Sequence, residues 1–330
     1  MKHTLSQGRA LSLVRSFKKA RILVLGDLML DEYLFGQVSR ISPEAPVPVV
    51  EVSSEKLMLG GAANVAWNIR ALGGTAVPVG VIGHDRAGNI MRTEFKSQKI
   101  ATTGLVAETG RRTTIKTRIV AHHQQVVRVD REHRQDISAA SERKVIAALN
   151  RLIPKADAML IEDYNKGLLT DNVIRAALEI CMRRGVPVTV DPKLKHFLDY
   201  VGATLFKPNV QETERALGVT IADDRDMDEA GSMLLGKLSA QAVLITAGEK
   251  GMYLFPRGGK RTHIPTLARE VYDVSGAGDT VISVITLALA CGASFEEAAV
   301  IANHAAGIEV SKFGVAAVSP EELTEALRSW

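Results

Sequence analysis

The chain has little cysteine, few aromatic residues and no long apolar run, and each scarcity excludes a class of protein. Cys181 and Cys291 are the only cysteines among 330 residues, too few for a disulfide framework or a cysteine-rich metal site. No stretch of about 18 uncharged apolar residues occurs, so we expect no membrane-spanning helix. The basic N-terminus lacks the continuous apolar region of a signal peptide. These absences favour the cytoplasm.

The charge of the chain is nearly balanced, which argues against a nucleic-acid partner. The formal net charge is +4 and the pI about 9.0, a weak excess for a chain of this length. Apolar residues make up 46% and charged residues 24%, as is usual in globular proteins. Basic residues do gather in 111–118 and 128–134. They form either a solvated face or a pocket for an anionic substrate.

Short apolar runs alternate with helical patterns along most of the chain. Residues 21–26, 77–82 and 186–190 are predicted strands, and 171–184 is a predicted helix. Strands separated by helices of about 10–15 residues indicate βαβ units. We therefore expect a single α/β domain over 1–330, with a doubly wound, mostly parallel sheet flanked by helices and two helices after residue 278. Ligands bind such sheets at the carboxyl ends of the strands.

Two segments break this rhythm with a period-two alternation of apolar and polar residues. Residues 33–57 and 111–131 are rich in Val, Ile, Thr and Tyr, which predicts antiparallel strands without crossover helices. We expect them to form a small β-sheet lid at the edge of the main sheet. The apolar face of such a lid needs a cover, which ligand closure or a homodimer through the lids would supply.

The most informative motif is D-V-S-G-A-G-D-T at residues 273–280. Gly276 and Gly278 allow the backbone to approach a ligand closely before a helix begins. Unpaired N–H groups and the positive end of the helix dipole meet at that point and favour an anion. Asp279 would lie beside a bound phosphate, placed to take a proton from an attacking hydroxyl. The alternative is that Asp279 only caps the helix.

Together with Gly60-Gly61-Ala62-Ala63-Asn64, this motif resembles the signature of the ribokinase family of sugar kinases, the pfkB type, and the resemblance covers nearly the whole chain. It implies a ribokinase-like fold with ATP and Mg²⁺ as cofactors. Asp279 matches the family's catalytic base, and the N–H groups of Gly276, Ala277 and Gly278 match its anion hole. Phosphoryl transfer needs this kind of positioning and charge neutralisation. Ser275 departs from the family, which often has Thr there.

The resemblance implies further site residues. Asn209 and Glu212 match an N-x-x-E motif that positions Mg²⁺ and its waters, and oxygen ligands suit this ion. Thr246, Gly248 and Gly251 match a T-x-G-x-x-G nucleotide loop. The nucleotide set is completed by Asn303 at the adenine pocket. Asp27 matches the family's sugar-binding Asp. From their positions at the ligand end of the sheet we also predict sugar contacts for Asp31, Gly60, Gly61 and Asn64, although the glycine pair alone could form a turn. Glu162, Asp163 and Asn165 either bind further hydroxyls or form a polar turn after a strand.

Four longer segments, 26–33, 39–48, 162–167 and 190–193, resemble the bacterial heptose 7-phosphate kinases. This implies phosphorylation of the 1-hydroxyl of D-glycero-β-D-manno-heptose 7-phosphate to the 1,7-bisphosphate, in lipopolysaccharide core biosynthesis. In many bacteria the kinase is fused to a nucleotidylyltransferase domain with an H-x-G-H motif. This motif is absent and the chain ends at Trp330, so we expect the stand-alone kinase.

The phosphate that such a substrate already carries needs a cationic partner. Arg118 and Arg128 of the predicted lid are the foremost candidates because they fall on alternating strands. Lys193 and Lys166 follow strands at the ligand end of the sheet and are further candidates.

Two other interpretations remain open. Another sugar or sugar-phosphate kinase of the same fold would share the two short motifs but not the four longer segments. A non-catalytic sugar-binding sensor would have no use for a base, so the intact Asp279 argues against it. The Walker pattern G-x-x-x-x-G-K-[ST] is absent, and the glycines at 276 and 278 lack the third glycine of a dinucleotide-binding fingerprint.

Overall fold

The computed structural model of the chain describes residues 5–122, 124–268, 271–312 and 316–329. The helices are α1 (Gln7–Ser16), α2 (Ala62–Ala71), α3 (Arg86–Ser97), α4 (Ala139–Leu152), α5 (Asp171–Arg184), α6 (Val210–Leu217), α7 (Asp224–Leu238), α8 (Ala277–Ala290), α9 (Phe295–Glu309) and α10 (Pro320–Arg328). The strands of the main sheet are β1 (Arg21–Gly26), β4 (Thr75–Gly83), β5 (Gly104–Glu108), β8 (Ala158–Glu162), β9 (Val188–Asp191), β10 (Leu205–Phe206), β11 (Ala242–Thr246), β12 (Met252–Pro256) and β13 (Thr262–Ile264).

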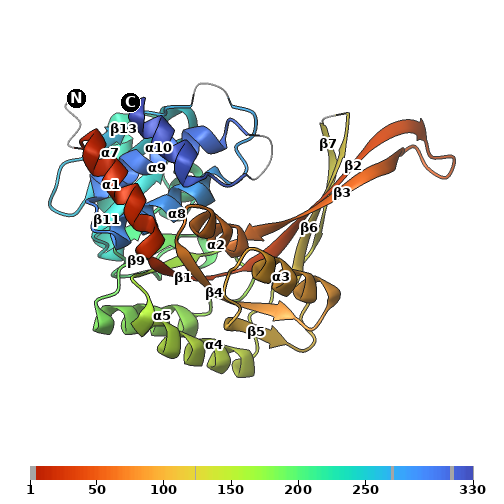
Figure 1. Cartoon of the computed structure of the whole chain (residues 1–330), viewed down its shortest axis with the longest axis horizontal. Helices are drawn as coiled ribbons and strands as arrows, with labels where there is room; N and C mark the ends of the chain where they lie inside the picture. Colours follow the sequence, from red (N-terminus) through yellow and green to blue (C-terminus); the bar gives the residue numbers. More distant parts are fainter. Residues whose placement is uncertain (1–4, 123, 269–270, 313–315, 330) are drawn as a thin grey trace.

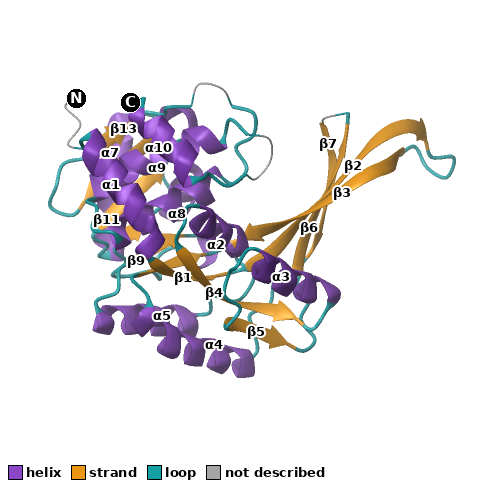
Figure 2. Cartoon of the chain, in the orientation of Figure 1, coloured by secondary structure: helices purple, strands orange, loops and turns teal. Residues whose placement is uncertain are grey.

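The main sheet has nine strands in the order β13-β12-β11-β10-β9-β8-β1-β4-β5, with helices on both faces (Figures 1 and 2). Every neighbouring pair from β11 to β5 is parallel, and β12 and β13 are antiparallel additions at one edge. This confirms the predicted mostly parallel, ribokinase-like α/β sheet. Its parallel strands end on a common edge, where ligands are expected.

Strand β1 shows why the sheet is covered on both faces. Side chains alternate along a strand, and all four central residues of β1 are buried. Ile22 and Val24 enter a core that includes buried residues of α1, α2, α8 and α9. Leu23 and Leu25 enter a second core with buried residues of α4, α5 and α7. A strand buried on both faces reads as a continuous apolar run, as this one does.

The helices after residue 278 differ from the prediction. Two were expected, and the structure adds a third, α10. It begins with a capping box of Ser319 and Glu322 around Pro320 at the first turn, a recognisable start signal that the sequence interpretation passed over. Among the described residues, no helix combines the length and the apolar composition needed to cross a membrane.

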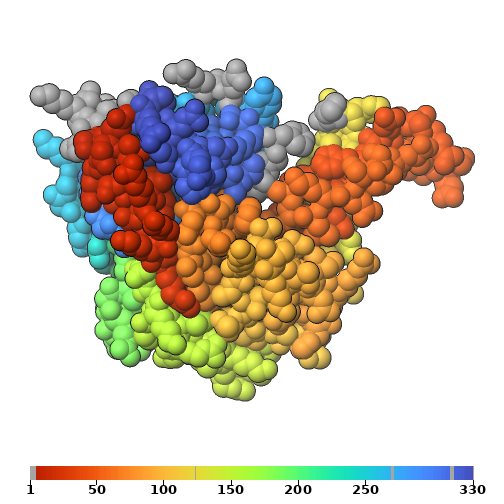
Figure 3. All heavy atoms as spheres, in the orientation of Figure 1, coloured from red at the N-terminus to blue at the C-terminus, as the bar shows by residue number. Residues whose placement is uncertain are grey.

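The predicted lid is present as a separate four-stranded sheet that projects from the body of the molecule (Figures 1 and 3). Its strands are β2 (Leu28–Ile41), β3 (Pro48–Gly61), β6 (Thr114–Ala121) and β7 (Gln124–Arg131), in the order β3-β2-β6-β7. Strands β2 and β3 extend beyond the predicted 33–57, and residues 111–113 precede the first strand of the second segment.

One expectation about the lid is wrong: β2 and β6 pair in parallel, not antiparallel. The chain leaves the lid after β3, builds α2, β4, α3 and β5 in the body, and then enters β6 from the body again. Both β2 and β6 therefore run outward from the body, which forces a parallel pair between two antiparallel hairpins.

The two faces of the lid differ in character. Side chains of paired residues lie on one face, and the register pairs Asp31 with Lys116 and Tyr33 with Arg118. The opposite face carries a row of Leu34, Ile119 and Val127. We call the first the charged face and the second the apolar face of the lid.

Candidate active site

Asp279 lies in the first turn of α8, directly after the glycine loop. Gly276 precedes the helix with φ 99°, a left-handed backbone that glycine adopts without strain. The N–H of Ala277 donates to the carbonyl of Val274 at 3.3 Å. Helix α8 has 14 residues, and its positive end lies at the glycine loop, next to Asp279. The motif predicts an anion site at this helix start.

Both carboxylate oxygens of Asp279 accept hydrogen bonds from distant parts of the chain. Asn64 Nδ2, on α2, donates to Oδ2 at 2.8 Å, and the Tyr164 hydroxyl, after β8, donates to Oδ1 at 3.1 Å. Burial raises the pKa of Asp279 to about 6, and the charge of Asp191 adds to this rise. The hydrogen bonds from Asn64 and Tyr164 and the charge of Lys207 lower the pKa in part. At neutral pH the group is mostly ionised and able to accept a proton.

Two further carboxylates meet Asp279 at the carboxyl ends of β8 and β9. Oxygen atoms of Glu162, Asp191 and Asp279 all lie within 4.8 Å of one another, and all three residues are buried. Burial, then the charges of Asp191 and Asp279, raise the pKa of Glu162 well above its ordinary value. Glu162 Oε2 is buried without a hydrogen-bond partner in the described structure. Hard oxygen ligands with a free lone pair fit Mg²⁺.

Lys207 supplies positive charge to this carboxylate cluster. It follows β10, is 3% exposed, and its Nζ lies 2.7 Å from Asp191 Oδ2. Burial alone lowers the pKa of Lys207, but the charges of Asp191, Glu162 and Glu212 raise it overall. Lys207 therefore remains protonated and offsets part of the repulsion between the buried carboxylates.

The N-x-x-E motif forms a capping box at the start of α6. The Asn209 side chain accepts from the Glu212 N–H at 2.8 Å, and Glu212 Oε2 accepts from the Asn209 N–H at 3.0 Å. Glu212 Oε1 contacts Lys193 Nζ. The motif that predicts Mg²⁺ positioning therefore also starts a helix, and the Glu212 carboxylate already accepts from two donors, the Asn209 N–H and Lys193 Nζ.

The predicted nucleotide residues line one cavity of about 490 Å³ beside the start of α8. Apolar side chains and glycines dominate its walls, which suits a planar base. Asn303 Nδ2 donates to the Pro265 carbonyl at 2.7 Å, so that its position is fixed. The predicted residues along the cavity are Thr246, Gly248, Gly251, Ala277, Gly278 and Asn303. The sequence thus identified segments that the fold brings together.

Asp27 holds the loop that carries Tyr164. Its carboxylate accepts from the backbone N–H groups of Tyr164 and Lys166, each at 3.0 Å, and of Leu168 at 3.3 Å. Burial raises the pKa of Asp27 to about 6 despite these donors. The predicted sugar ligand is therefore also an anchor for the loop after β8.

Asp31, Gly60 and Gly61 lie at the base of the lid. Asp31 is 6% exposed and pairs with Arg118, whose guanidinium is 5.3 Å from the centroid of the Tyr33 ring. A Cβ on Gly60 would collide with Asp31 Oδ2, and a Cβ on Gly61 would lie 2.7 Å from the Asp27 carbonyl oxygen. Both glycines are required by close packing at this junction.

Three other predicted residues already have partners within the protein. Asp163 accepts from the Tyr200 hydroxyl and from the Asn165 N–H, both at 2.8 Å, and Asn165 has a left-handed φ of 53°. Arg128 pairs with Asp130 at 2.8 Å and lies opposite Arg118 in the register. These bonds shape the loop after β8 and the charged face of the lid.

Four residues at this site were not identified as functional from the sequence. Tyr164, Asp191 and Lys207 follow the carboxyl ends of neighbouring strands, where ligands collect, so their positions alone carried a signal. Lys116 is two residues before Arg118 on β6 and shares its face. The composition indicated only a cluster of basic residues there.

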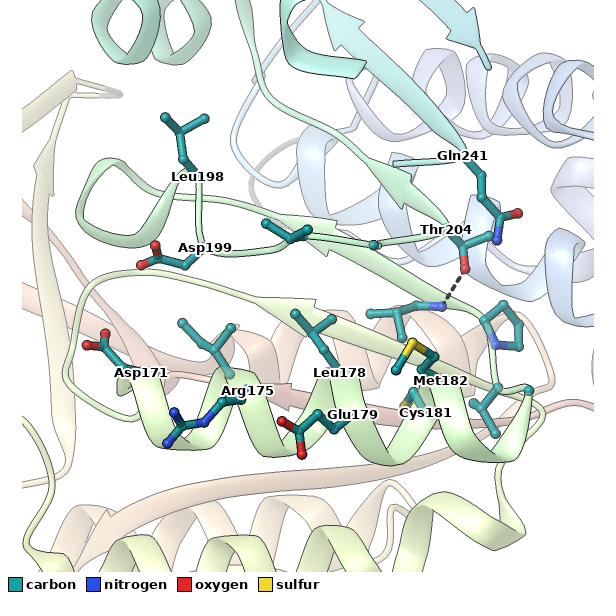
Figure 4. Close-up of a pocket in the computed structure, with 17 residues that line it drawn as sticks. Asp171, Arg175, Leu178, Glu179, Cys181, Met182, Leu198, Asp199, Thr204 and Gln241 are labelled. Atoms are coloured by element: carbon teal, nitrogen blue, oxygen red, sulfur yellow. Dashed lines mark hydrogen bonds between the residues drawn. The ribbon is translucent and has the colours of Figure 1, made fainter. Parts of the chain in front are cut away.

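A groove of about 840 Å³ elsewhere on the molecule is larger than the nucleotide cavity (Figure 4). It runs between α5 and the segment 198–204, with Asp171, Arg175 and Glu179 along the helix. None of the predicted site residues lines it. Size alone therefore does not locate the active site.

Curated relatives align with most of this chain. The bifunctional protein HldE of Citrifermentans bemidjiense is 50% identical over 303 residues, covering 92% of this chain and 62% of the relative. The protein of the same name from Geobacter sulfurreducens is 46% identical over 305 residues, again covering 92% and 62%. The chain thus spans less than two thirds of the length of these relatives, and the stand-alone form stays a prediction.

Solved structures share the fold at low sequence identity. Arabidopsis thaliana ribokinase, complexed with ribose and ATP, superposes with a TM-score of 0.75 at 19% identity, over 94% of this chain and 99% of that one. Phosphofructokinase-2 from Escherichia coli, in complex with potassium, gives 0.77 at 18% identity with the same coverage. A profile of the pfkB family carbohydrate kinases matches residues 19–322. The chain belongs to this family and is a carbohydrate kinase.

Proposed function

We propose that the chain transfers the γ-phosphoryl group of ATP to the 1-hydroxyl of D-glycero-β-D-manno-heptose 7-phosphate, giving the 1,7-bisphosphate for lipopolysaccharide core biosynthesis. The observation that carries the chemistry is the position of Asp279, between a nucleotide cavity and donors on the lid side of the sheet. The heptose substrate is supported by the four longer sequence segments that resemble heptose 7-phosphate kinases.

In this mechanism Asp279 accepts the proton of the sugar hydroxyl while the hydroxyl oxygen bonds to the γ-phosphorus of ATP. The bond from that phosphorus to the bridging oxygen breaks, and ADP leaves. Its pKa of about 6 suits this role, since a base works best when its pKa is near the working pH. The start of α8 stabilises negative charge on the transferred group. Asn64 and Tyr164 hold the two carboxylate oxygens and so orient the base.

Glu162 and Asp191 would hold Mg²⁺, with Glu212 reaching the ion through water. Oxygen atoms of Glu162, Asp191 and Asp279 lie within 4.8 Å of one another, and with Lys207 paired to Asp191 they leave a buried negative region that fits a divalent cation. When bound, the ion neutralises charge on the ATP phosphates. The protein's share of the work is to keep these oxygens in place, which Lys207 and Lys193 assist by pairing with Asp191 and Glu212.

We also propose a homodimer through the apolar face of the lid. Val127 and Val129 on β7 and Leu57 on β3 are 45%, 46% and 39% exposed, and contact with a second copy would remove this apolar surface of a projecting sheet from water. The charged face, with Asp31 and Arg118, would remain free to cover the sugar. Light scattering on the eluting protein should give twice the chain mass, and the double variant Val127→Asp, Val129→Asp should elute as a monomer.

The direct test is ADP release from ATP and Mg²⁺ with heptose 7-phosphate, fructose 6-phosphate, ribose or no sugar. Strong turnover with the heptose alone would establish the proposed reaction. Turnover with another sugar would keep the chemistry and replace the substrate. A folded protein that binds ATP yet is silent with every acceptor would favour the sugar-binding sensor instead.

A further inference from the structure

Lys116 differs from the other cations around the candidate sugar site, because no described group forms an ion pair with its ammonium or accepts a hydrogen bond from it. Arg111 also lacks a described ion pair but donates to backbone carbonyls. The pairs at this end of the sheet are Arg118 with Asp31, Arg128 with Asp130, Lys166 with Glu132, Lys193 with Glu212 and Lys207 with Asp191. Lys116 is nevertheless half-buried on β6. Its cross-strand neighbours Asp31 and Asp130 already pair with Arg118 and Arg128, so they only partly offset the cost of withdrawing the ammonium from water. The arrangement therefore favours an anion beside Lys116.

The surroundings of Lys116 place that anion on the lid side of the base. Its Nζ is 5.3 Å from the centroid of the Tyr164 ring, whose hydroxyl donates to Asp279 at 3.1 Å. The Tyr164 ring thus lies between Lys116 and the catalytic carboxylate. No residue of β6 lines the nucleotide cavity. An anion on Lys116 is accordingly separate from the position expected for the ATP base.

The charges around Lys116 leave a positive excess, because Lys116, Arg118, Arg128 and Lys166 face only the described carboxylates Asp31, Asp130 and Glu132. Burial lowers the pKa of Lys116, the charges of Asp31 and Asp130 oppose this, and the charges of Lys166 and Arg128 add to it, so that the pKa is lowered overall. Arg118 projects from the same face of β6, two residues on. Arg118, Lys166 and Arg128 keep their own carboxylates, so they add potential while the Lys116 ammonium is available to donate hydrogen bonds.

We propose that Lys116 binds the phosphate monoester that the acceptor sugar already carries, and so selects phosphorylated sugars over neutral ones. This rests on the proposed function for the identity of the acceptor. The lysine is a specificity residue, since it contacts the unreactive phosphate and not the hydroxyl that attacks. The sequence predicts Arg118 and Arg128 as the foremost candidates for this role. Because both already pair with a carboxylate, Asp31 and Asp130, we assign the direct contact to Lys116.

The test compares Lys116→Met and Lys116→Arg with the wild type. For Lys116→Met, the KM for heptose 7-phosphate should rise roughly 10- to 100-fold, the usual worth of a charged hydrogen bond. The KM for ATP and the KM for unphosphorylated heptose should stay within about twofold. Lys116→Arg should recover much of the loss, because it restores the charge. Lys144→Met, on the exposed side of α4, is the matched control and should change nothing.

A binding measurement keeps this proposal apart from the proposed function. With a non-hydrolysable ATP analogue present to occupy the start of α8, inorganic phosphate should raise the Tm of the wild type but not of Lys116→Met. This difference should appear even if heptose 7-phosphate proves not to be the substrate. Equal phosphate shifts in both proteins, or equal KM changes for phosphorylated and neutral sugars, would overturn the assignment.

Discussion

Asn64 and Asp279 lie 215 positions apart in the sequence, yet Asn64 Nδ2 donates to Asp279 Oδ2 at 2.8 Å. Asn64 is in the first turn of α2, after the lid strand β3, and Asp279 is in the first turn of α8. The base of the lid and the glycine loop thus share one hydrogen bond. Substitutions at the base of the lid and in the glycine loop should therefore both affect the Asp279 carboxylate.

Replacing Asp279 with Asn should abolish most of the phosphoryl transfer while the protein stays folded. The amide keeps the size of the side chain but cannot accept the proton, so we expect kcat to fall roughly 10²- to 10⁴-fold. Nucleotide binding, measured by titration calorimetry with ATP, should change little. Asp171→Asn, at a carboxylate that is 88% exposed, is the control. Turnover near the wild-type rate would remove Asp279 as the base.

The pH dependence of catalysis should have an acidic limb near pH 6. Asp279 accepts a proton only when ionised, and its pKa is about 6, so kcat/KM should rise with pH through this value and then level off. Asp27 also has a pKa of about 6. If both carboxylates must be ionised, kcat/KM falls more steeply at acidic pH than with a single titrating group. A profile that is flat from pH 5 to 8 would contradict this prediction.

The same pKa values predict how stability depends on pH. The folded state binds the proton of Asp279 more tightly than the unfolded state does, because the pKa is raised from 3.8 to about 6. The contribution of this group to stability is therefore full below pH 3.8 and is lost as pH rises through about 6. The loss amounts to about 3 kcal/mol at most. The free energy of unfolding in urea should therefore fall between pH 4 and pH 7. This fall should be smaller in Asp279→Asn than in the wild type.

Replacing Tyr164 with Phe should move the acidic limb upward without removing activity. The Tyr164 hydroxyl donates to Asp279 and lowers its pKa, so its loss raises the pKa and shifts the limb of kcat/KM to higher pH. We expect kcat at pH 7 to fall by about 10-fold or less, in line with one hydrogen bond to a charged group. Tyr253→Phe, whose hydroxyl is 3.5 Å from Asp224, should leave the limb in place. A lower kcat with an unmoved limb would indicate a packing role alone.

The sequence predicted the strand at 21–26 and the helix at 171–184 because their signals are local, whereas β5, β12 and β13 were not predicted. The strand at 21–26 is a continuous apolar run, and the helix at 171–184 has a Thr170 cap and a Gly185 end. The parallel pairing of β2 and β6 was missed because alternation reveals a strand but not its partner. Pairing depends on where the chain re-enters the lid, which only the three-dimensional path decides.

Residues of the short motifs lie close together in the structure, whereas several residues beside them were not predicted. Thr246, Gly251 and Asn303 meet in one cavity, as the family resemblance implies. Tyr164 lies in the segment 162–167 and Lys116 in the basic cluster 111–118, but neither was singled out, because their contacts form only when the lid and the loop after β8 meet. The charge count indicated an anion site, but only the ion pairs of the structure separate Lys116 from its paired neighbours.

A methyl group at Gly60 should impair sugar binding through the lid. The Cβ of Gly60→Ala would collide with Asp31 Oδ2 and so displace the carboxylate that pairs with Arg118. We expect the KM for the sugar to rise about 10-fold or more, since a buried ion pair is disturbed, while the KM for ATP stays the same. Gly236→Ala is the control, because its Cβ meets nothing within 4 Å on α7 and alanine favours a helix. If Gly60→Ala changed the two KM values equally, the base of the lid would have no specific part in holding the sugar.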